Sequence, residues 1–252
     1  MEKQRLDKLL ASTGKWSRRE IRLLVRAGRV LVDGIPAASA EEKYDPSAVG
    51  LSVDGEPVAY CRTTWLMMNK PGGVLSATED GRGSTVLDLL PPQYSRMGLF
   101  PVGRLDRDTE GLLLLTNDGK AAHRLLSPRH HVSKVYYVRV RGCLTEEDCA
   151  AFQRGMLLGD GLQCMPAELK IQCTAAESEA YVTLWEGKFH QIKRMLAACG
   201  KPVVYLRRVQ MGNLTLDPAL GAGKYRCLSI QEVQKLLDSE ELVASVQNID
   251  KF

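Results

Sequence analysis

One short segment of the chain combines a carboxylate with rigid support beneath it. Residues 103–106 read Gly-Arg-Leu-Asp, the wholly apolar run 112–115 follows, and Asn-Asp-Gly at 117–119 ends it. The run is too short for a typical helix and predicts a strand that is buried on both faces. Asp106 is therefore expected on a loop packed against a rigid strand, as a reactive group requires. Its carboxylate could serve as a nucleophile or base, or it could fix the loop as an Asx-turn residue.

Charged neighbours of Asp106 differ in what they offer. Asp108 and Glu110 are interpreted as solvated loop charges. Arg104, two residues before Asp106, could contact a phosphate group. A carboxylate in a dry pocket tends to become protonated, and a nearby cation favours its charged form. The site hypothesis therefore requires a cation from another part of the chain.

Several motifs occur in order along the chain. Met-Asn-Lys-Pro-Gly-Gly at 68–73 precedes the Gly-Arg-Leu-Asp loop, and Ser-Pro-Arg-His-His at 127–131 and Lys-Val-Tyr at 134–136 follow it. Glu-Gly-Lys-Phe-His-Gln-Ile-Lys-Arg-Met then occupies 186–195. This set of motifs resembles the pseudouridine synthases, and within that family the type that modifies ribosomal RNA. The sequences of the motifs at 127–131 and 190–195 are most similar to the branch that acts on small-subunit (16S) rRNA.

The resemblance implies roles for particular residues. Asp106 would be the indispensable catalytic residue, and Tyr136 would stack on the extruded base, although an ordinary strand tyrosine is the alternative. Lys193 is the matching cation where many relatives have arginine; because lysine lacks the bidentate geometry of arginine, Arg194 stays a second candidate. The expected substrate-binding residues are Arg104, Arg194, His190, Arg129 and His130.

The first 35 residues hold nine basic and four acidic groups, a local charge of +5 in a chain of net charge +4. Leu-rich spacing predicts a helix over 6–10, and Ser-Arg-Arg-Glu at 17–20 is a capping box for a second helix. The segment resembles the small RNA-binding domain named for the fourth small-subunit ribosomal protein. A solvated basic face is the alternative. The predicted RNA-docking residues are Arg5, Lys15, Arg18, Arg19, Arg22, Arg26 and Arg29.

Strand-like and helical runs interleave without regular crossover spacing, so the pattern favours an α+β fold. Strands are predicted at 65–68, 112–115, 135–140, 180–185 and 203–206, and helices at 120–126, 146–154, 189–199 and 229–237. The resemblance implies a largely antiparallel sheet with a central cleft. We predict an RNA-binding domain with its connector at 1–60, a catalytic domain at 61–240 and a C-terminal tail at 241–252.

Other classes of function find little support. The seven cysteines form no Cys-x-x-Cys pair, and the four histidines lack metal-binding spacing, so no zinc site is predicted. A base deaminase is not predicted either, because its zinc-binding signature is missing. No cofactor is expected. No run reaches the roughly 18 apolar residues of a membrane span, and we expect a monomeric cytoplasmic protein.

The sequence thus predicts an enzyme that isomerises a specific uridine of ribosomal RNA, with small-subunit RNA or a ribosomal assembly particle as its partner. The alternatives are a non-catalytic rRNA-binding or ribosome-assembly factor and a synthase of the same family acting on 23S rRNA. The reaction needs no redox or energy input, which fits the absence of a nucleotide-binding motif.

Overall fold

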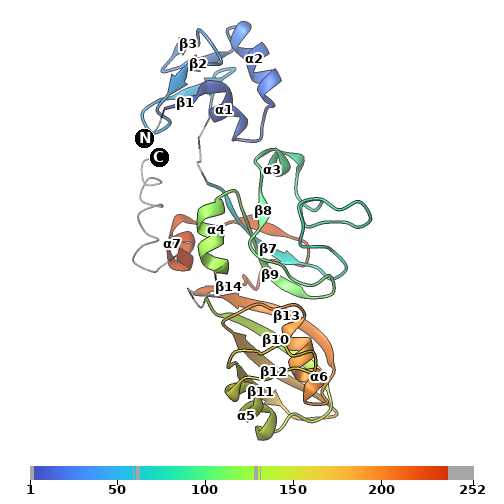
Figure 1. Ribbon diagram of the computed structural model, residues 1–252. Helices are drawn as coiled ribbons and strands as arrows, with labels where there is room; N and C mark the ends of the chain where they lie inside the picture. The colour runs from blue at the N-terminus through green and yellow to red at the C-terminus, as the bar shows by residue number, and fades with distance from the viewer. Residues whose placement is uncertain (1–2, 59, 61–62, 128–129, 131, 238–252) are drawn as a thin grey trace.

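The computed structural model describes residues 3–58, 60, 63–127, 130 and 132–237 of the 252-residue chain. Within these residues the chain forms a small N-terminal α/β unit and a larger unit built on one long sheet (Figure 1). No helix in the described ranges is long and apolar enough to cross a membrane. The predicted tail at 241–252 and residue Arg129 lie outside the described residues.

The N-terminal unit packs two helices on a small antiparallel sheet. Its core forms from one face of each helix and from the inward positions of the strands, including Leu6, Leu10, Ile21 and Val30. Ser17 and Glu20 form the predicted capping box, with each backbone N–H bonded to the other side chain, at 2.7 and 3.2 Å. The elements are β1 (Gln4–Arg5), α1 (Leu6–Ala11), α2 (Arg18–Arg26), β2 (Val30–Val32), β3 (Ile35–Pro36), β4 (Lys43–Tyr44), β5 (Leu51–Val53) and β6 (Glu56–Pro57).

The larger unit is organised around a nine-stranded mixed sheet of order β11-β12-β10-β13-β9-β7-β15, in which β14 also pairs with β13 and β8 with β9. All of its pairings except β13 with β9 are antiparallel. Its strands are β7 (Trp65–Lys70), β8 (Phe100–Pro101), β9 (Glu110–Thr116), β10 (Lys134–Arg141), β11 (Glu168–Cys173), β12 (Glu177–Leu184), β13 (Val203–Met211), β14 (Leu214–Thr215) and β15 (Tyr225–Cys227). The helices are α3 (Pro92–Arg96), α4 (Gly119–Leu126), α5 (Glu146–Arg154), α6 (Gln191–Ala198) and α7 (Ile230–Leu237).

The predicted α+β fold with a mainly antiparallel mixed sheet is confirmed. Every strand and helix predicted in this unit is present, with ends shifted by a few residues. The run 112–115 lies inside β9, where all four leucines are fully buried and divide between two cores on opposite faces of the sheet. The sequence patterns did not predict the short strands β8, β14 and β15, the polar edge strand β11 or helix α3.

One short parallel contact joins the two halves of the large sheet. Arg207 and Arg208 of β13 pair with Glu110 and Gly111 of β9, and the described contact between the two strands consists of these two residue pairs. Gly111 has a φ of 97°, and a Cβ at this position would collide with the backbone oxygen of Arg208. This parallel contact between β9 and β13 therefore requires glycine at position 111. It lies at the start of β9, directly after the Asp106 loop.

Candidate active site

The loop that carries Asp106 is fixed through its backbone. Leu105 is buried in the core beneath the loop, and its N–H and C=O both bond the hydroxyl of buried Ser76, at 3.1 and 3.0 Å. The N–H of Thr109 bonds the carbonyl of Asp106 at 3.1 Å and tightens the turn. The carboxylate of Asp106 thus projects from a backbone that is anchored on both sides.

A fully buried lysine holds the same loop from below. The ammonium of Lys70, at the end of β7, donates to the carbonyls of Pro71, Arg107 and Thr109 at 2.9, 3.2 and 2.8 Å. Burial lowers the pKa of Lys70 to about 8, although the neighbouring carboxylates of Asp108, Glu110 and Asp106 act in the opposite direction. One cation therefore satisfies three carbonyls and joins the 68–73 motif to the Asp106 loop.

Lys193 of α6 supplies the cation that the site hypothesis requires. Its Nζ lies 3.0 Å from Oδ2 of Asp106 and 2.6 Å from Oδ1 of Asp108. Burial disfavours the ammonium form, but hydrogen bonds to the two carboxylates outweigh it, and the pKa of Lys193 is raised. The side chains of Asp106 and Lys193 are 25% and 23% exposed, whereas Asp108 is 75% exposed. The inner pair is therefore sheltered and the outer carboxylate faces solvent.

The sequence interpretation of Asp108 and Glu110 as solvated loop charges is corrected by these contacts. Asp108 is exposed but ion-paired, and its hydrogen bond from Lys193 lowers its pKa. Glu110 is half-buried and accepts a hydrogen bond from the hydroxyl of Tyr205 at 2.8 Å. Because β13 carries Tyr205, this bond ties the loop to the other half of the sheet.

The turn before α6 aims Lys193 at the loop. Helix α6 begins at Gln191, two residues later than predicted, because His190 takes a left-handed conformation with a φ of 49°. The amide of Gln191 accepts from the N–H of Lys188 at 3.0 Å and donates to the carboxylate of Glu186 at 2.7 Å. Glu186 is buried and also accepts from the N–H of Met165 at 2.8 Å. This buried pair sets the start, and hence the orientation, of α6.

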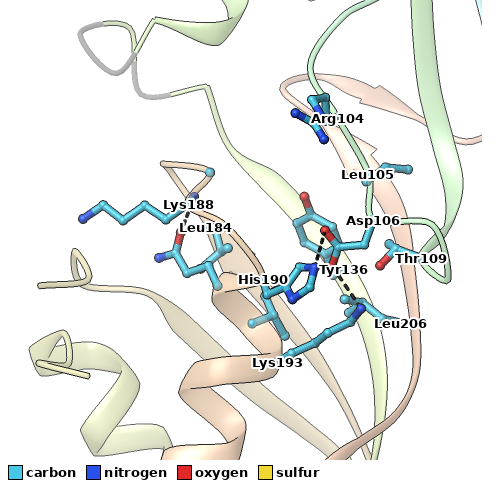
Figure 2. Close-up of a pocket in the computed structure, with 13 residues that line it drawn as sticks. Arg104, Leu105, Asp106, Thr109, Tyr136, Leu184, Lys188, His190, Lys193 and Leu206 are labelled. Carbon is cyan, nitrogen blue, oxygen red and sulfur yellow. Dashed lines mark hydrogen bonds and ion pairs between the residues drawn. The ribbon is translucent and has the colours of Figure 1, made fainter. Parts of the chain in front are cut away.

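Figure 2 shows Asp106 pointing toward Lys193 and His190, with the ring of Tyr136 beside it. Nε2 of His190 lies 3.6 Å from Oδ1 of Asp106. Arg104 reaches the same cleft from the loop, and Leu206 of β13 contributes an apolar wall. The cleft thus combines a carboxylate, a cation, a phenol ring and an arginine at its rim. Such a site can shelter a planar base while its exposed rim contacts phosphate.

Other residues selected from the sequence lie elsewhere. Arg194, the alternative partner of Asp106, points away and pairs with Asp160. His130 is exposed and is absent from the cleft lining. Arg194 and His130 therefore make no contact with Asp106 that the structure describes.

The predicted RNA-docking residues divide into two groups. Arg5 holds the fully buried carboxylate of Asp7 with two hydrogen bonds, which lower the pKa of Asp7, and Arg29 forms a two-bond pair with Asp54. Arg22 lies 3.7 Å from Asp7 and keeps its exposed side chain at the surface. Exposed residues of this set that make no ion pair within the described part of the chain are Lys15, Arg18, Arg19 and Arg26.

Sequence reasoning gave no role to Lys70, Ser76, Glu186 or Gln191. A sequence signal existed for Lys70, since it lies two residues after the apolar run 65–68 that predicts a strand, and a lysine that continues a buried strand needs partners. The three-residue spacing of Lys188 and Gln191 resembles a capping pattern. Among the described residues no group of three or more His, Cys, Asp or Glu side chains is placed to hold a metal ion.

Comparison with known proteins agrees with this geometry. A family model described as RNA pseudouridylate synthase matches residues 64–198, and one described as S4 domain matches residues 4–49. The chain is 49% identical to an uncharacterized RNA pseudouridine synthase, YtzG, of Bacillus subtilis, over 92% of this chain and 98% of the relative. It is 37% identical to ribosomal small subunit pseudouridine synthase A of Vibrio cholerae, over 92% and 99% of the two chains.

A solved structure agrees as well. A crystal structure of a pseudouridylate synthase, 34% identical, superposes with a TM-score of 0.64 and covers 92% of this chain and 99% of its own. Because these matches cover 92% of the chain, each includes residues of both the small N-terminal unit and the larger unit.

Proposed function

We infer that this chain, which belongs to the RNA pseudouridine synthase family, isomerises a uridine of ribosomal RNA, with small-subunit (16S) RNA as the favoured target. Its S4 domain is an RNA-binding domain. Support for the small-subunit target comes from the relative in Vibrio cholerae, whose name specifies the ribosomal small subunit, and from the motifs at 127–131 and 190–195.

The observation that carries the catalytic assignment is the sheltered pair of Asp106 and Lys193, 3.0 Å apart beside the ring of Tyr136. In the reaction the bond from ring nitrogen to the sugar breaks, the uracil turns, and a new bond forms from the sugar to ring carbon 5. The proton lost from that carbon is balanced by one gained at the ring nitrogen. Asp106 acts as nucleophile or base, and the charge of Lys193 offsets the cost of sheltering its carboxylate.

The other residues serve the substrate. A base inside folded RNA cannot be reached, so the uridine must be extruded into the cleft. Tyr136 stacks on it, and Arg104, His190 and Arg194 contact the surrounding nucleotides, with Arg129 and His130 as further RNA contacts. Residues 1–60 dock on RNA through phosphate contacts and residues 61–240 perform the chemistry. Ribosomal RNA as substrate implies a cytoplasmic enzyme, and we expect it to act as a monomer.

The decisive test is a map of pseudouridine in 16S and 23S rRNA from cells with the wild-type protein, with Asp106→Asn and without the protein. We expect one site in 16S rRNA to lose its pseudouridine in the second and third strains. Loss of a site in 23S rRNA instead would reassign the target. Unchanged maps in all three strains would overturn the function.

A further inference from the structure

A large apolar ring, that of Phe189, stands exposed beside the catalytic cleft, in the chain between the cleft-lining residues Lys188 and His190. The side chain of Phe189 is 74% exposed, the highest value among the large hydrophobic residues that the structure describes as exposed. One face of its ring lies on His190, with the ring centroids 3.8 Å apart and the planes 19° from parallel. The other face therefore accounts for the exposure. A single exposed phenylalanine is ordinary on a protein surface, but Phe189 differs in the contacts that hold it there.

The backbone holds this ring pair in place at a cost. His190 has a φ of 49°, which is unfavourable for a residue with a Cβ. The turn is stabilised by the bonds of Gln191 to Lys188 and Glu186, and Arg194 donates to the carbonyl of Phe189 at 3.4 Å. A regular helix start would carry Phe189 elsewhere. The hydrogen bonds among Lys188, Gln191 and Glu186 thus hold an apolar ring in an exposed position.

The ring pair is also attached to the chemistry. His190 lies between Phe189 and the carboxylate of Asp106, with its Nε2 3.6 Å from Oδ1. Lys193 follows on the same helix, one turn along. A base that stacked on the free face of Phe189 would therefore be separated from His190 by the phenylalanine ring alone. It would lie near the uridine that is proposed to occupy the cleft. That is the place of a neighbour of the reacting uridine along the RNA strand.

We propose that Phe189, backed by His190, forms a stacking subsite for the nucleobase adjacent to the extruded uridine. This inference rests on the proposed function. When the uridine leaves the helix, its neighbour loses a stacking partner, and unstacking is part of the cost of extrusion. An aromatic ring replaces that partner without reading its identity, because every base has a π-face. Phe189 then stabilises the opened RNA, whereas the Asp106 pocket binds the base removed from it.

Kinetics on a 16S rRNA transcript test the subsite. Phe189→Ala is expected to raise KM by about 5- to 150-fold, the fold-change that corresponds to loss of one base–aromatic stack, with kcat changed less than about threefold. Phe189→Tyr should restore the wild-type KM, because the ring is kept. The matched control is Leu157→Ala, which removes an apolar side chain that is 70% exposed but, unlike Phe189, does not adjoin a cleft-lining residue in the chain, and it should leave KM unchanged. A wild-type KM in Phe189→Ala would overturn the proposal.

Fluorescence provides a second readout that does not need turnover. In an Asp106→Asn background, Phe189→Trp should add emission that the transcript quenches, compared with the same background without the new tryptophan. Absence of this additional quenching, with RNA bound, would also overturn the subsite. The proposed function fails by a different result, namely no pseudouridine formed in either rRNA by the wild-type protein, so the two failures are distinguishable.

Discussion

The basic helix α2 and the catalytic cleft both depend on positive charge but use it in different ways. All five arginines at positions 18–29, on α2 and directly after it, are exposed, and three of them make no ion pair within the described chain. At the active site, Lys193 in the cleft has two oxygen partners within 3.2 Å and Lys70 beneath the loop has three. Exposed charges act at long range and are screened by salt, whereas sheltered charges act through geometry. Single substitutions of the basic residues on α2 should therefore reduce function less than single substitutions of the lysines at the active site.

The largest expected effect is at Asp106. Asp106→Asn keeps the shape of the side chain but removes its charge, so we expect kcat to fall by at least about 10³-fold while RNA affinity changes little. Asp108→Asn is the matched control. It shares the same lysine but is exposed, so its effect should stay within about tenfold. Single-turnover assays together with filter binding measure both quantities. Equal losses in the two variants would contradict the assignment of the sheltered carboxylate.

Substitution of Lys193 comes next. Lys193→Met leaves the Asp106 carboxylate without its cation, and we expect a loss of about 10²- to 10³-fold in kcat, the range found for one electrostatic donor in an active site. Lys193→Arg keeps the charge and should retain most of the activity. Arg194→Met removes a neighbouring charge that pairs with Asp160, and because its proposed role is RNA contact it should lower RNA affinity more than kcat. A greater loss in Arg194→Met than in Lys193→Met would contradict the geometric assignment.

Lys70→Met should act on stability before chemistry. Three carbonyls lose their donor, and we expect the free energy of unfolding to fall by roughly 3 kcal/mol. Lys120→Met removes an exposed lysine and should change it by less than about 0.5 kcal/mol. Urea titrations of the two variants and the wild type provide the measurement. A Lys70→Met protein as stable as Lys120→Met would show that the loop does not need the ammonium.

The same variant has a pH dependence with a definite sign. The folded pKa of Lys70 is about 8 and its ordinary value is 10.5, so between these values the unfolded chain binds more protons than the folded one. Raising the pH from 8 to 10 therefore stabilises the wild type relative to Lys70→Met, by about 2 kcal/mol. Below about pH 7, where Lys70 is protonated in both the folded and the unfolded chain, the difference in the free energy of unfolding between the two proteins should be constant. A difference that shrinks as pH rises would reverse the sign and disprove the depressed pKa.

The smallest effects are expected on the basic helix. Replacing Arg18, Arg19 or Arg26 by glutamine should weaken rRNA binding only a few-fold and lower the slope of log affinity against log salt by about 1 for each. Arg29→Gln is the control, because Arg29 already pairs with Asp54, and its slope should change less. A salt series of binding titrations measures this. A loss of turnover from one of these changes at saturating RNA would remove the distinction between helix and cleft.

Much of the fold was predictable because local patterns decide it. The apolar run 112–115 is a buried strand in any compact fold, and the capping boxes at Ser17 and Ser229 specify helix starts through bonds between residues three apart. The same run also predicts that Asp106, which precedes the strand, lies on a loop. The short strands β8, β14 and β15 carry no such pattern, since two or three residues show no periodicity.

The sequence alone determined the types of chemical group, their order along the chain and the strand and helix that carry the main candidates. Only the tertiary structure decided which groups meet. Lys193 and Arg194 are neighbours in sequence but lie about 100° apart around a helix, and the turn at His190 rotates one toward Asp106 and the other toward Asp160. Lys70 likewise became part of the site because β7 and β9 pair at a register that places it under the loop. Contacts between distant segments depend on register and helix rotation, which no local pattern encodes.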